Sequence, residues 1–342
     1  MAWERWGGWL YPVGMSDSQM GKMVVLCPGQ GAQFVGMGKA WREASALAAG
    51  VFDAADRIVG SRLPGKLSEL CASGPETTLN RTDVAQPAIF VASVACFRAR
   101  FGEVSFDHFC AFAGLSLGEY SALHLGGAMD FESALELVLL RGRAMQDAAE
   151  ASKGSMVALI GADEAQADAV CAAAAQGEVL VPANYNAPGQ IVLSGHATAC
   201  DRAVVEGDKL GLKATKLQVA GAFHSPLMAP AAERLGKALA TTAIKAPRTT
   251  VMSNVTAQPH AADPSSGKGI EDSIRARLVA QLTQPVRWSQ GCSWLVSAYP
   301  SATTEYHELA PNKVLSGLMR RIDRGTKVVN HDAPAAPVAS GA

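Results

Sequence analysis

A serine between two glycines, placed where an apolar run meets the start of a helix, constrains the fold of this chain more than any other feature. Residues 109–113 form an apolar run of buried-strand length, Gly114-Leu-Ser-Leu-Gly118 follows, and residues 119–125 begin a helix. Such a tight strand-to-helix turn exposes its serine beside helix-terminal N–H groups that can stabilise an oxyanion. Ser116 is therefore a candidate nucleophile, although the same short pattern also occurs on ordinary turns.

Composition favours a large buried core and excludes several classes of partner. Of the 342 residues, 49% are hydrophobic and 18% are charged, and the formal net charge is −1. A nearly neutral chain has no overall bias towards nucleic acid or an anionic membrane, and no apolar run reaches the roughly 18 residues of a membrane span. The seven scattered cysteines show no metal-binding spacing. We therefore expect a reduced, intracellular protein without a metal.

A glycine-rich loop at residues 28–38 follows a predicted strand at residues 23–27. It lacks both the dinucleotide pattern and the lysine of a phosphate-binding loop. What it offers is the Gln30 amide and free backbone N–H groups at the carboxyl end of a strand, where ligands bind in open α/β sheets. Gln86 lies just before Pro87 in the first turn of a predicted helix, where it faces either solvent or this loop.

Two further side chains are candidates for the same site. Arg141 lies in a strongly periodic predicted helix at residues 131–149, where most arginines are simply surface residues. His224 comes just before a predicted helix at residues 230–241, where a capping or core role is the common alternative. The residues alone leave both alternatives open.

The order of predicted elements indicates two subdomains. Residues 155–217 read as strand, helix, strand, strand, helix, strand, which is typical of a ferredoxin-like fold. We predict an α/β fold in which this unit is inserted into an α/β-hydrolase-like subdomain with a parallel sheet. The predicted parts are a disordered extension at 1–22, the large catalytic subdomain at 23–150 and 220–325, the small subdomain at 151–219, and a disordered tail at 326–342.

Four motifs in one order resemble the malonyl-CoA:acyl carrier protein transacylases of fatty acid synthesis and the related acyltransferase domains of polyketide synthases. The motifs are Gly29-Gln-Gly-Ala-Gln33, Gly114–Gly118 followed by Glu119, Arg141, and Ala222-Phe-His224. The likeness covers roughly residues 23–322. Each motif alone is modest, but the ordered set is highly specific.

The resemblance implies a mechanism. Ser116 would take the malonyl group from CoA as an ester, and His224 would act as its base and then as the acid for the leaving thiol. Gln30 and the backbone N–H of Leu117 would form the oxyanion hole. In this family a backbone carbonyl near the position of Asn254, rather than an acidic side chain, orients the histidine.

The resemblance also implies the substrate and its contacts. Arg141 matches the arginine that grips the malonyl carboxylate, because a guanidinium offers that group two parallel hydrogen bonds. Gln86 resembles a glutamine that orients this arginine, and the bulk of Phe223 favours malonyl over methylmalonyl. The implied partners are malonyl-CoA and holo acyl carrier protein. We expect no cofactor, a monomer and a cytoplasmic location.

Three departures from the family pattern stand out. Leu115 occupies the position where most members have histidine, Ala310-Pro-Asn312 replaces the usual Gly-Pro-Gly turn, and residues 1–22 have no counterpart. Three other functions stay open: a trans-acting acyltransferase of a polyketide pathway, a serine esterase or thioesterase with the same turn, and a noncatalytic carrier-binding protein that kept the fold.

Overall fold

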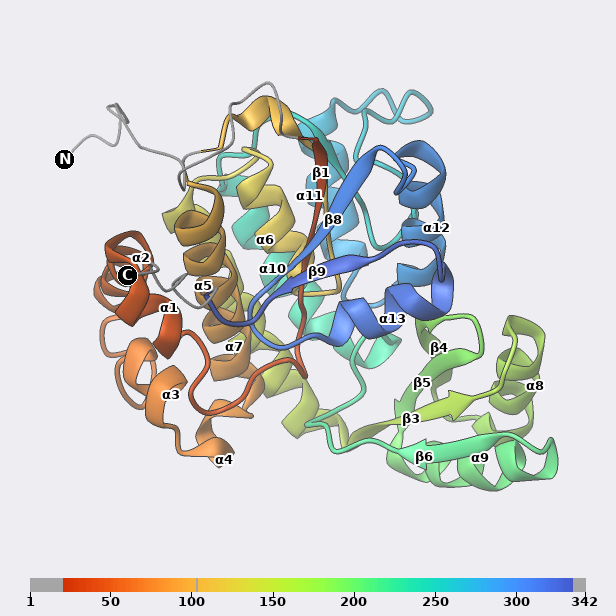
Figure 1. The fold of residues 1–342 in the computed structure, drawn as a ribbon. Coiled ribbons are helices and arrows are strands. Elements are labelled where there is room, and N and C mark those ends of the chain that lie inside the picture. Colours follow the sequence, from red (N-terminus) through yellow and green to blue (C-terminus); the bar gives the residue numbers. More distant parts are fainter. Residues whose placement is uncertain (1–20, 103, 335–342) are drawn as a thin grey trace, which may run out of the picture.

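Two sheets and the helices that cover them make up the protein, and the computed structural model describes residues 21–102 and 104–334 (Figure 1). The strands are β1 (Lys22–Cys27), β2 (Phe109–Gly114), β3 (Gly154–Ile160), β4 (Leu180–Ala187), β5 (Gln190–His196), β6 (Lys213–Lys216), β7 (Thr250–Val251), β8 (Thr304–Leu309) and β9 (Val328–His331). The helices are α1 (Lys39–Ala44), α2 (Ala46–Val59), α3 (Leu67–Ser73), α4 (Glu76–Leu79), α5 (Thr82–Phe101), α6 (Gly118–Leu125), α7 (Phe131–Ser152), α8 (Glu164–Ala175), α9 (Ala197–Lys209), α10 (Ala229–Thr241), α11 (Ile270–Ala280), α12 (Trp288–Ala298) and α13 (Val314–Ile322), with short 3₁₀ turns at Phe106–His108 and Pro226–Met228.

The large sheet is parallel and covered on both faces. Its strand order is β7-β2-β1-β8-β9, with β1 in the middle. Successive side chains of a strand point to opposite faces. Val24 and Leu26 accordingly pack in one cluster with α12 and α13, whereas Met23 and Val25 pack in the main cluster with α2, α5, α6 and α7. Burial of both faces explains why the β1 segment is apolar throughout rather than alternating.

Helix α5 runs through the main cluster. By length and composition it is the only helix among residues 21–102 and 104–334 that could cross a membrane, and 83% of its most apolar window is buried inside the protein. It packs against α2, α6 and α7. Its apolar composition therefore reflects its central place in the core of the large subdomain.

The small sheet is antiparallel, with the strand order β4-β5-β3-β6. Helices α8 and α9 pack on it and share a separate hydrophobic cluster with β3, β4 and β5. Figure 1 shows this unit at the lower right, apart from the large sheet. The parallel sheet and this ferredoxin-like unit confirm the predicted fold class. The predicted limits 151–219 enclose the small sheet and its two helices.

The predicted disordered tail at 326–342 is wrong in its first part. Residues Val328–His331 form β9, which pairs in parallel with β8. The backbone oxygen of His331 accepts a hydrogen bond from the Trp41 indole at 3.0 Å, and the His331 side chain is buried. This strand closes one edge of the large sheet. Residues 335–342, and residues 1–20 of the predicted extension, lie outside the described part of the chain.

Candidate active site

Ser116 lies on a sharp turn between β2 and α6. Its φ of 53° falls in the left-handed region, which a residue with a side chain adopts only where the surroundings enforce it. A Cβ on Gly114 would lie 1.9 Å from the backbone of Gly118, and one on Gly118 would lie 2.1 Å from the Cys27 oxygen. The two glycines are therefore required by the close packing of the turn against the end of β1.

The hydroxyl of Ser116 meets the imidazole of His224. Ser116 Oγ lies 2.8 Å from His224 Nε2, and His224 Nδ1 lies 2.7 Å from the backbone oxygen of Gln281. Because a carbonyl oxygen can only accept, Nδ1 carries the proton and Nε2 presents its lone pair to the serine hydroxyl. His224 thus has the tautomer that a general base requires.

The surroundings keep His224 neutral. Burial, and next the positive charge of Arg141, lower the pKa of His224 to about 4, while the hydrogen bond to the Gln281 oxygen opposes this shift. At neutral pH the imidazole is therefore uncharged and available to take a proton from Ser116.

Arg141 of α7 is fully buried beside the nucleophile. Its Nη2 donates to Ser116 Oγ at 3.1 Å and to Gln281 Oε1 at 3.0 Å, and its Nη1 donates to Gln86 Oε1 at 2.5 Å. The ring of Tyr120 lies 5.3 Å from the guanidinium carbon. The structure thus brings Ser116, His224, Arg141 and Gln86 together, as the sequence-based hypothesis requires.

In the part of the chain that the structure describes, the partners of the Arg141 guanidinium are uncharged groups. Within the described residues, no carboxylate lies within ion-pair distance of its guanidinium, and its Nε has no hydrogen-bond partner. Burial lowers the pKa of Arg141, opposed by Tyr120 and by the charge of Glu119. Isolating a buried charge is unfavourable unless a ligand completes the pairing. The site is therefore suited to a ligand that carries an anionic group close to its reacting carbon.

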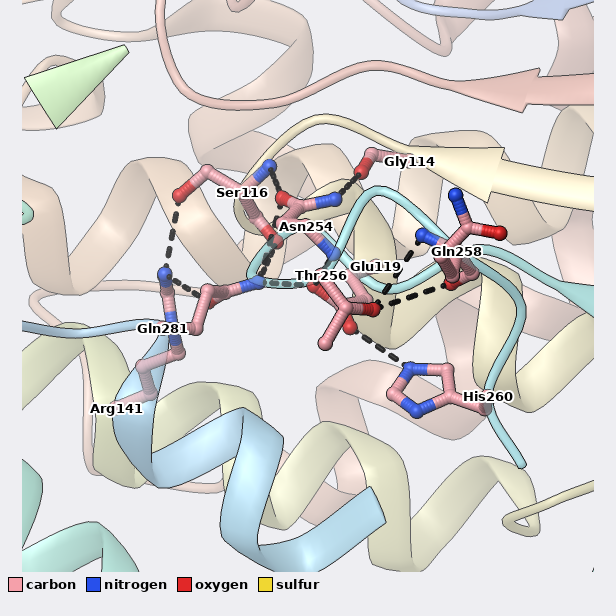
Figure 2. Close-up of polar contacts among 9 residues, drawn as sticks. All are labelled: Gly114, Ser116, Glu119, Arg141, Asn254, Thr256, Gln258, His260 and Gln281. Atoms are coloured by element: carbon pink, nitrogen blue, oxygen red, sulfur yellow. Dashed lines mark hydrogen bonds and ion pairs between the residues drawn. The ribbon is translucent and has the colours of Figure 1, made fainter. Parts of the chain in front are cut away.

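The prediction for Asn254 is wrong. The carbonyl that orients His224 belongs to Gln281, which caps the end of α11. The side chain of Asn254 instead holds the serine turn: its Oδ1 accepts from Ser116 N at 2.6 Å, and its Nδ2 donates to the oxygen of Gly114 at 2.7 Å (Figure 2). Asn254 therefore fixes the backbone that presents the nucleophile.

The other predicted residues lie around this centre. A Cβ on Gly29 would lie 2.2 Å from the Leu115 oxygen, so the loop after β1 packs directly on the serine turn. The Gln30 side chain donates to Thr82 Oγ1 at 3.4 Å. Within the described residues, the backbone N–H groups of Gln30 and Leu117 donate no hydrogen bond and remain available. Phe223 is buried in the main cluster, directly before the base.

Three buried polar residues of the site were not predicted. The Gln281 side chain bridges Arg141 and Glu119, and His260 Nε2 lies 2.8 Å from Glu119 Oε1. Glu119 was noted as part of the motif, but without a role. A search for polar residues that interrupt the apolar face of residues 270–282 could have identified Gln281.

No group of three or more His, Cys, Asp or Glu side chains in the described part of the chain is arranged to hold a metal ion. The chemistry on offer is that of a hydroxyl activated by a neutral imidazole, beside a buried guanidinium. This arrangement suits transfer of an acyl group through a covalent serine ester.

Known proteins with the same sequence pattern support this interpretation. Residues 24–300 match the acyl transferase domain family. A malonyl CoA-acyl carrier protein transacylase from Bacillus subtilis (strain 168) is 38% identical over 312 residues, which cover 91% of this chain and 93% of that protein. The solved malonyl CoA-acyl carrier protein transacylase of Coxiella burnetii superposes with a TM-score of 0.84 at 34% identity, over 92% of this chain and 95% of that one.

A second solved structure contains a carrier protein. It is a type II polyketide synthase acyl-carrier protein, in holo form, in complex with its malonyl-transacylase, and it matches with a TM-score of 0.84 at 34% identity, over 92% of this chain and 97% of that one. Family, fold and length thus agree over most of the chain. This protein belongs to the acyl transferase family, and within it to the malonyl-CoA:acyl carrier protein transacylases.

Proposed function

We propose that this chain transfers the malonyl group of malonyl-CoA to the phosphopantetheine thiol of a holo acyl carrier protein, through a malonyl ester on Ser116, for fatty acid synthesis. The observation that carries the proposal is the placement of Ser116 Oγ between the lone pair of a neutral His224 and the guanidinium of Arg141. The names of the related proteins support the same substrate and acceptor.

In the first half-reaction, Nε2 of His224 takes the hydroxyl proton as Ser116 Oγ attacks the thioester carbon. The negative charge on the carbonyl oxygen is stabilised by the free N–H groups of Gln30 and Leu117. The carbon–sulfur bond then breaks, and the CoA thiolate takes from His224 the proton that Ser116 gave up. The Gln281 carbonyl stabilises the transient imidazolium through Nδ1.

The second half-reaction runs the same steps in reverse with a different thiol. The phosphopantetheine thiol gives its proton to His224, and its sulfur attacks the ester carbon. The ester bond breaks, and Ser116 Oγ recovers the proton from Nε2. One base therefore serves both halves, and the neutral resting state of His224 is restored at the end of each.

Arg141 would select the acyl group. Its buried and uncompensated charge gives a malonyl carboxylate an ion pair with two parallel hydrogen bonds, which an acetyl group cannot form. Gln86 holds Nη1 and so limits rotation of the guanidinium. Phe223, packed directly before His224, would leave little room for a methyl branch, a discrimination worth about 1–3 kcal/mol.

Product analysis tests the proposed function. The protein is incubated with malonyl-CoA, with and without holo acyl carrier protein, and malonyl-carrier and free malonate are measured. We expect malonyl-carrier as the main product when the carrier is present and little malonate without it. Malonate in both reactions, with no malonyl-carrier, would show an esterase or thioesterase instead. No ester on Ser116 together with no transfer in a folded sample would favour the noncatalytic alternative.

A polyketide pathway is the second candidate, because one matching structure pairs a malonyl-transacylase with a type II polyketide synthase carrier. The two pathways differ in the acceptor. Comparison of kcat/KM for a carrier protein of fatty acid synthesis and one of a polyketide synthase distinguishes them, and we expect the former to be the better acceptor.

We further propose that the protein is a monomer in the cytoplasm. All seven cysteines are free thiols, and six of them are buried. Burial raises the pKa of Cys71, Cys96 and Cys171 to about 12, so these thiols are protonated and unreactive. Such thiols are typical of a reducing compartment.

Light scattering after size exclusion measures the oligomeric state, and a mass of two chains would overturn the monomer.

A further inference from the structure

The carboxamide of Gln281 connects the arginine of the site to a buried carboxylate (Figure 2). Its Oε1 accepts from Arg141 Nη2 at 3.0 Å. Its Nε2 donates to Glu119 Oε2 at 2.6 Å and to the backbone oxygen of Ser116 at 3.0 Å. Gln281 is fully buried, as is Glu119. One amide therefore links the guanidinium, the nucleophile's backbone and an acidic side chain.

The orientation of this amide depends on Glu119. The oxygen and nitrogen of a carboxamide are similar in size, so packing alone does not decide which of them faces Arg141. A guanidinium only donates hydrogen bonds, and a carboxylate only accepts them. With the amide reversed, Nε2 would face the N–H groups of Arg141 and Oε1 would face the oxygens of Glu119. Glu119 therefore opposes the reversed orientation and makes the shortest hydrogen bond to Nε2, at 2.6 Å, while the Ser116 oxygen and Asn254 Oδ1 accept from the same nitrogen at 3.0 and 3.4 Å.

Glu119 is itself held from two further directions. His260 Nε2 lies 2.8 Å from Glu119 Oε1, and the backbone N–H of Asn254 donates to Glu119 Oε2 at 3.2 Å. The side chains of His260 and Glu119 are 0% and 1% exposed, so water does not compete for these hydrogen bonds. Figure 2 shows Glu119 between Gln281 and His260, away from the nucleophile. Among the described residues, the hydrogen bonds of His260 go to Glu119 and, from its backbone N–H, to Val251.

We propose that Glu119, held by His260, is a positioning residue that fixes the orientation of the Gln281 amide and thereby aims Nη2 of Arg141 at the acyl group on Ser116. The inference rests on the proposed malonyl transfer. It assigns to the interior of the protein a chain of hydrogen bonds that runs from His260 through Glu119 and Gln281 to the substrate-binding guanidinium. The chain acts on the binding of the malonyl carboxylate through side chains, whereas the group that orients His224 is the backbone carbonyl of Gln281.

A merely structural role for Glu119 is the competing explanation, because the residue lies in the first turn of α6, where a negative charge stabilises the helix N-terminus. The two roles predict different effects on the selectivity between malonyl and acetyl groups. Loss of folded protein lowers malonyl and acetyl transfer by the same factor, whereas misdirection of Arg141 lowers malonyl transfer more than acetyl transfer.

The test begins with malonyl and acetyl transfer by the wild-type protein, since absence of malonyl transfer there would refute the proposed function itself. The kcat/KM values for both acyl groups are then measured for Glu119→Leu, which has no acceptor, and Glu119→Gln, which keeps one. We expect Glu119→Leu to lower malonyl transfer about ten- to a hundredfold more than acetyl transfer. We expect Glu119→Gln to recover most of the malonyl selectivity, because its amide oxygen can still accept from Gln281.

His260→Leu keeps the inference testable if Glu119→Leu does not fold. Removal of this donor loosens Glu119, and we expect malonyl transfer to fall about three- to tenfold more than acetyl transfer. His260→Gln, which restores a donor, should recover the malonyl transfer. The matched control is His124→Leu, because His124 is likewise a buried histidine and its contacts lie outside the chain of hydrogen bonds. The control should leave the malonyl-to-acetyl ratio unchanged.

A double-mutant cycle completes the test. In an Arg141→Ala background there is no guanidinium to aim, so His260→Leu should no longer change the malonyl-to-acetyl ratio. Retention of the full effect in that background would overturn the inference. Equal losses of malonyl and acetyl transfer in the Glu119 and His260 variants, while the wild type transfers malonyl normally, would overturn the inference and leave the proposed function intact.

Discussion

Two buried histidine sites in the large subdomain have similar pKa shifts but different neighbours. Burial lowers the pKa to about 4 for His224 beside Ser116, and also for His307 and His331 at the β8–β9 edge of the sheet. His224 meets a hydroxyl and a backbone carbonyl. In the edge pair, His307 Nδ1 lies 3.0 Å from His331 Nε2, and the two rings stack with their centres 5.2 Å apart.

The comparison shows that a displaced pKa does not by itself identify an active site. In the edge pair one ring nitrogen of each histidine meets the other and joins β9 to β8, and His307 Nε2 lies 3.2 Å from a carboxylate oxygen of Glu305. His224 has a nucleophile on one nitrogen and an orienting oxygen on the other, with a guanidinium beside them. Function therefore follows from which groups a neutral imidazole faces, and this difference can be tested at each site.

The largest expected difference is in catalysis. We expect His224→Ala to lower malonyl transfer by at least about ten-thousandfold, because Ser116 loses its base. His331→Gln should stay within about threefold of the wild type. Transfer to holo carrier protein is measured at saturating and limiting malonyl-CoA, with circular dichroism to verify folding. Comparable losses in both variants would remove the distinction between the two sites.

The next largest effect concerns the guanidinium of Arg141, which donates a hydrogen bond to the nucleophile at the His224 site. We expect Arg141→Ala to lower kcat/KM for malonyl-CoA by about a hundred- to a thousandfold, but to lower kcat/KM for acetyl-CoA less than about tenfold. The ratio of the two values is the readout. A ratio equal to that of the wild type would make Arg141 a structural residue.

The pH dependence of catalysis sharpens the comparison. Because the pKa of His224 is lowered to about 4, the base stays neutral and kcat/KM for acetyl transfer should fall only as the pH approaches 4. Arg141 contributes to this lowering, so Arg141→Ala should move the acidic limb to higher pH. The profile is recorded in the range where both proteins remain folded. A limb that stays in place, or moves to lower pH, would contradict the electrostatic coupling.

The smallest effect should appear in stability alone. His331 has a folded pKa of about 4, below its ordinary value of 6.5, so the folded state binds its proton less readily than the unfolded chain does. This contribution to stability is complete above pH 6.5 and is lost as the pH falls towards 4. His331→Gln removes it, and the free energy of unfolding should then depend on pH less steeply, by up to about 1.4 kcal/mol per pH unit. Urea unfolding at several pH values measures this slope.

The local patterns of the sequence predicted the helices and strands better than they predicted the polar contacts between distant residues. Gly114 and Gly118 identified the serine turn, because their spacing reflects a close packing that the structure shows. The family resemblance, rather than periodicity, placed Arg141 and His224 together. Gln281 could not be found in this way, since it lies 165 residues from Ser116 and its burial depends on how α11 docks.

The prediction of a disordered tail at 326–342 missed the strand β9 for a similar reason. The strand β9 is only four residues long, and its sequence contains a single pair of valines before a Pro/Ala-rich end. Such a strand gains its order from pairing with β8 and from the Trp41 hydrogen bond, neither of which is visible in the local sequence. Edge strands of this kind are specified by the sheet that they join.

Labelling with malonyl-CoA in the absence of carrier protein tests the central claim most directly. The wild-type protein is mixed with excess radiolabelled malonyl-CoA, quenched in acid and digested, and the labelled peptide is identified by mass spectrometry. We expect about one malonyl group per chain, attached to Ser116, no label in Ser116→Ala, and release of the label on addition of holo acyl carrier protein. A folded protein that transfers malonyl while Ser116 stays unlabelled would contradict a covalent serine ester.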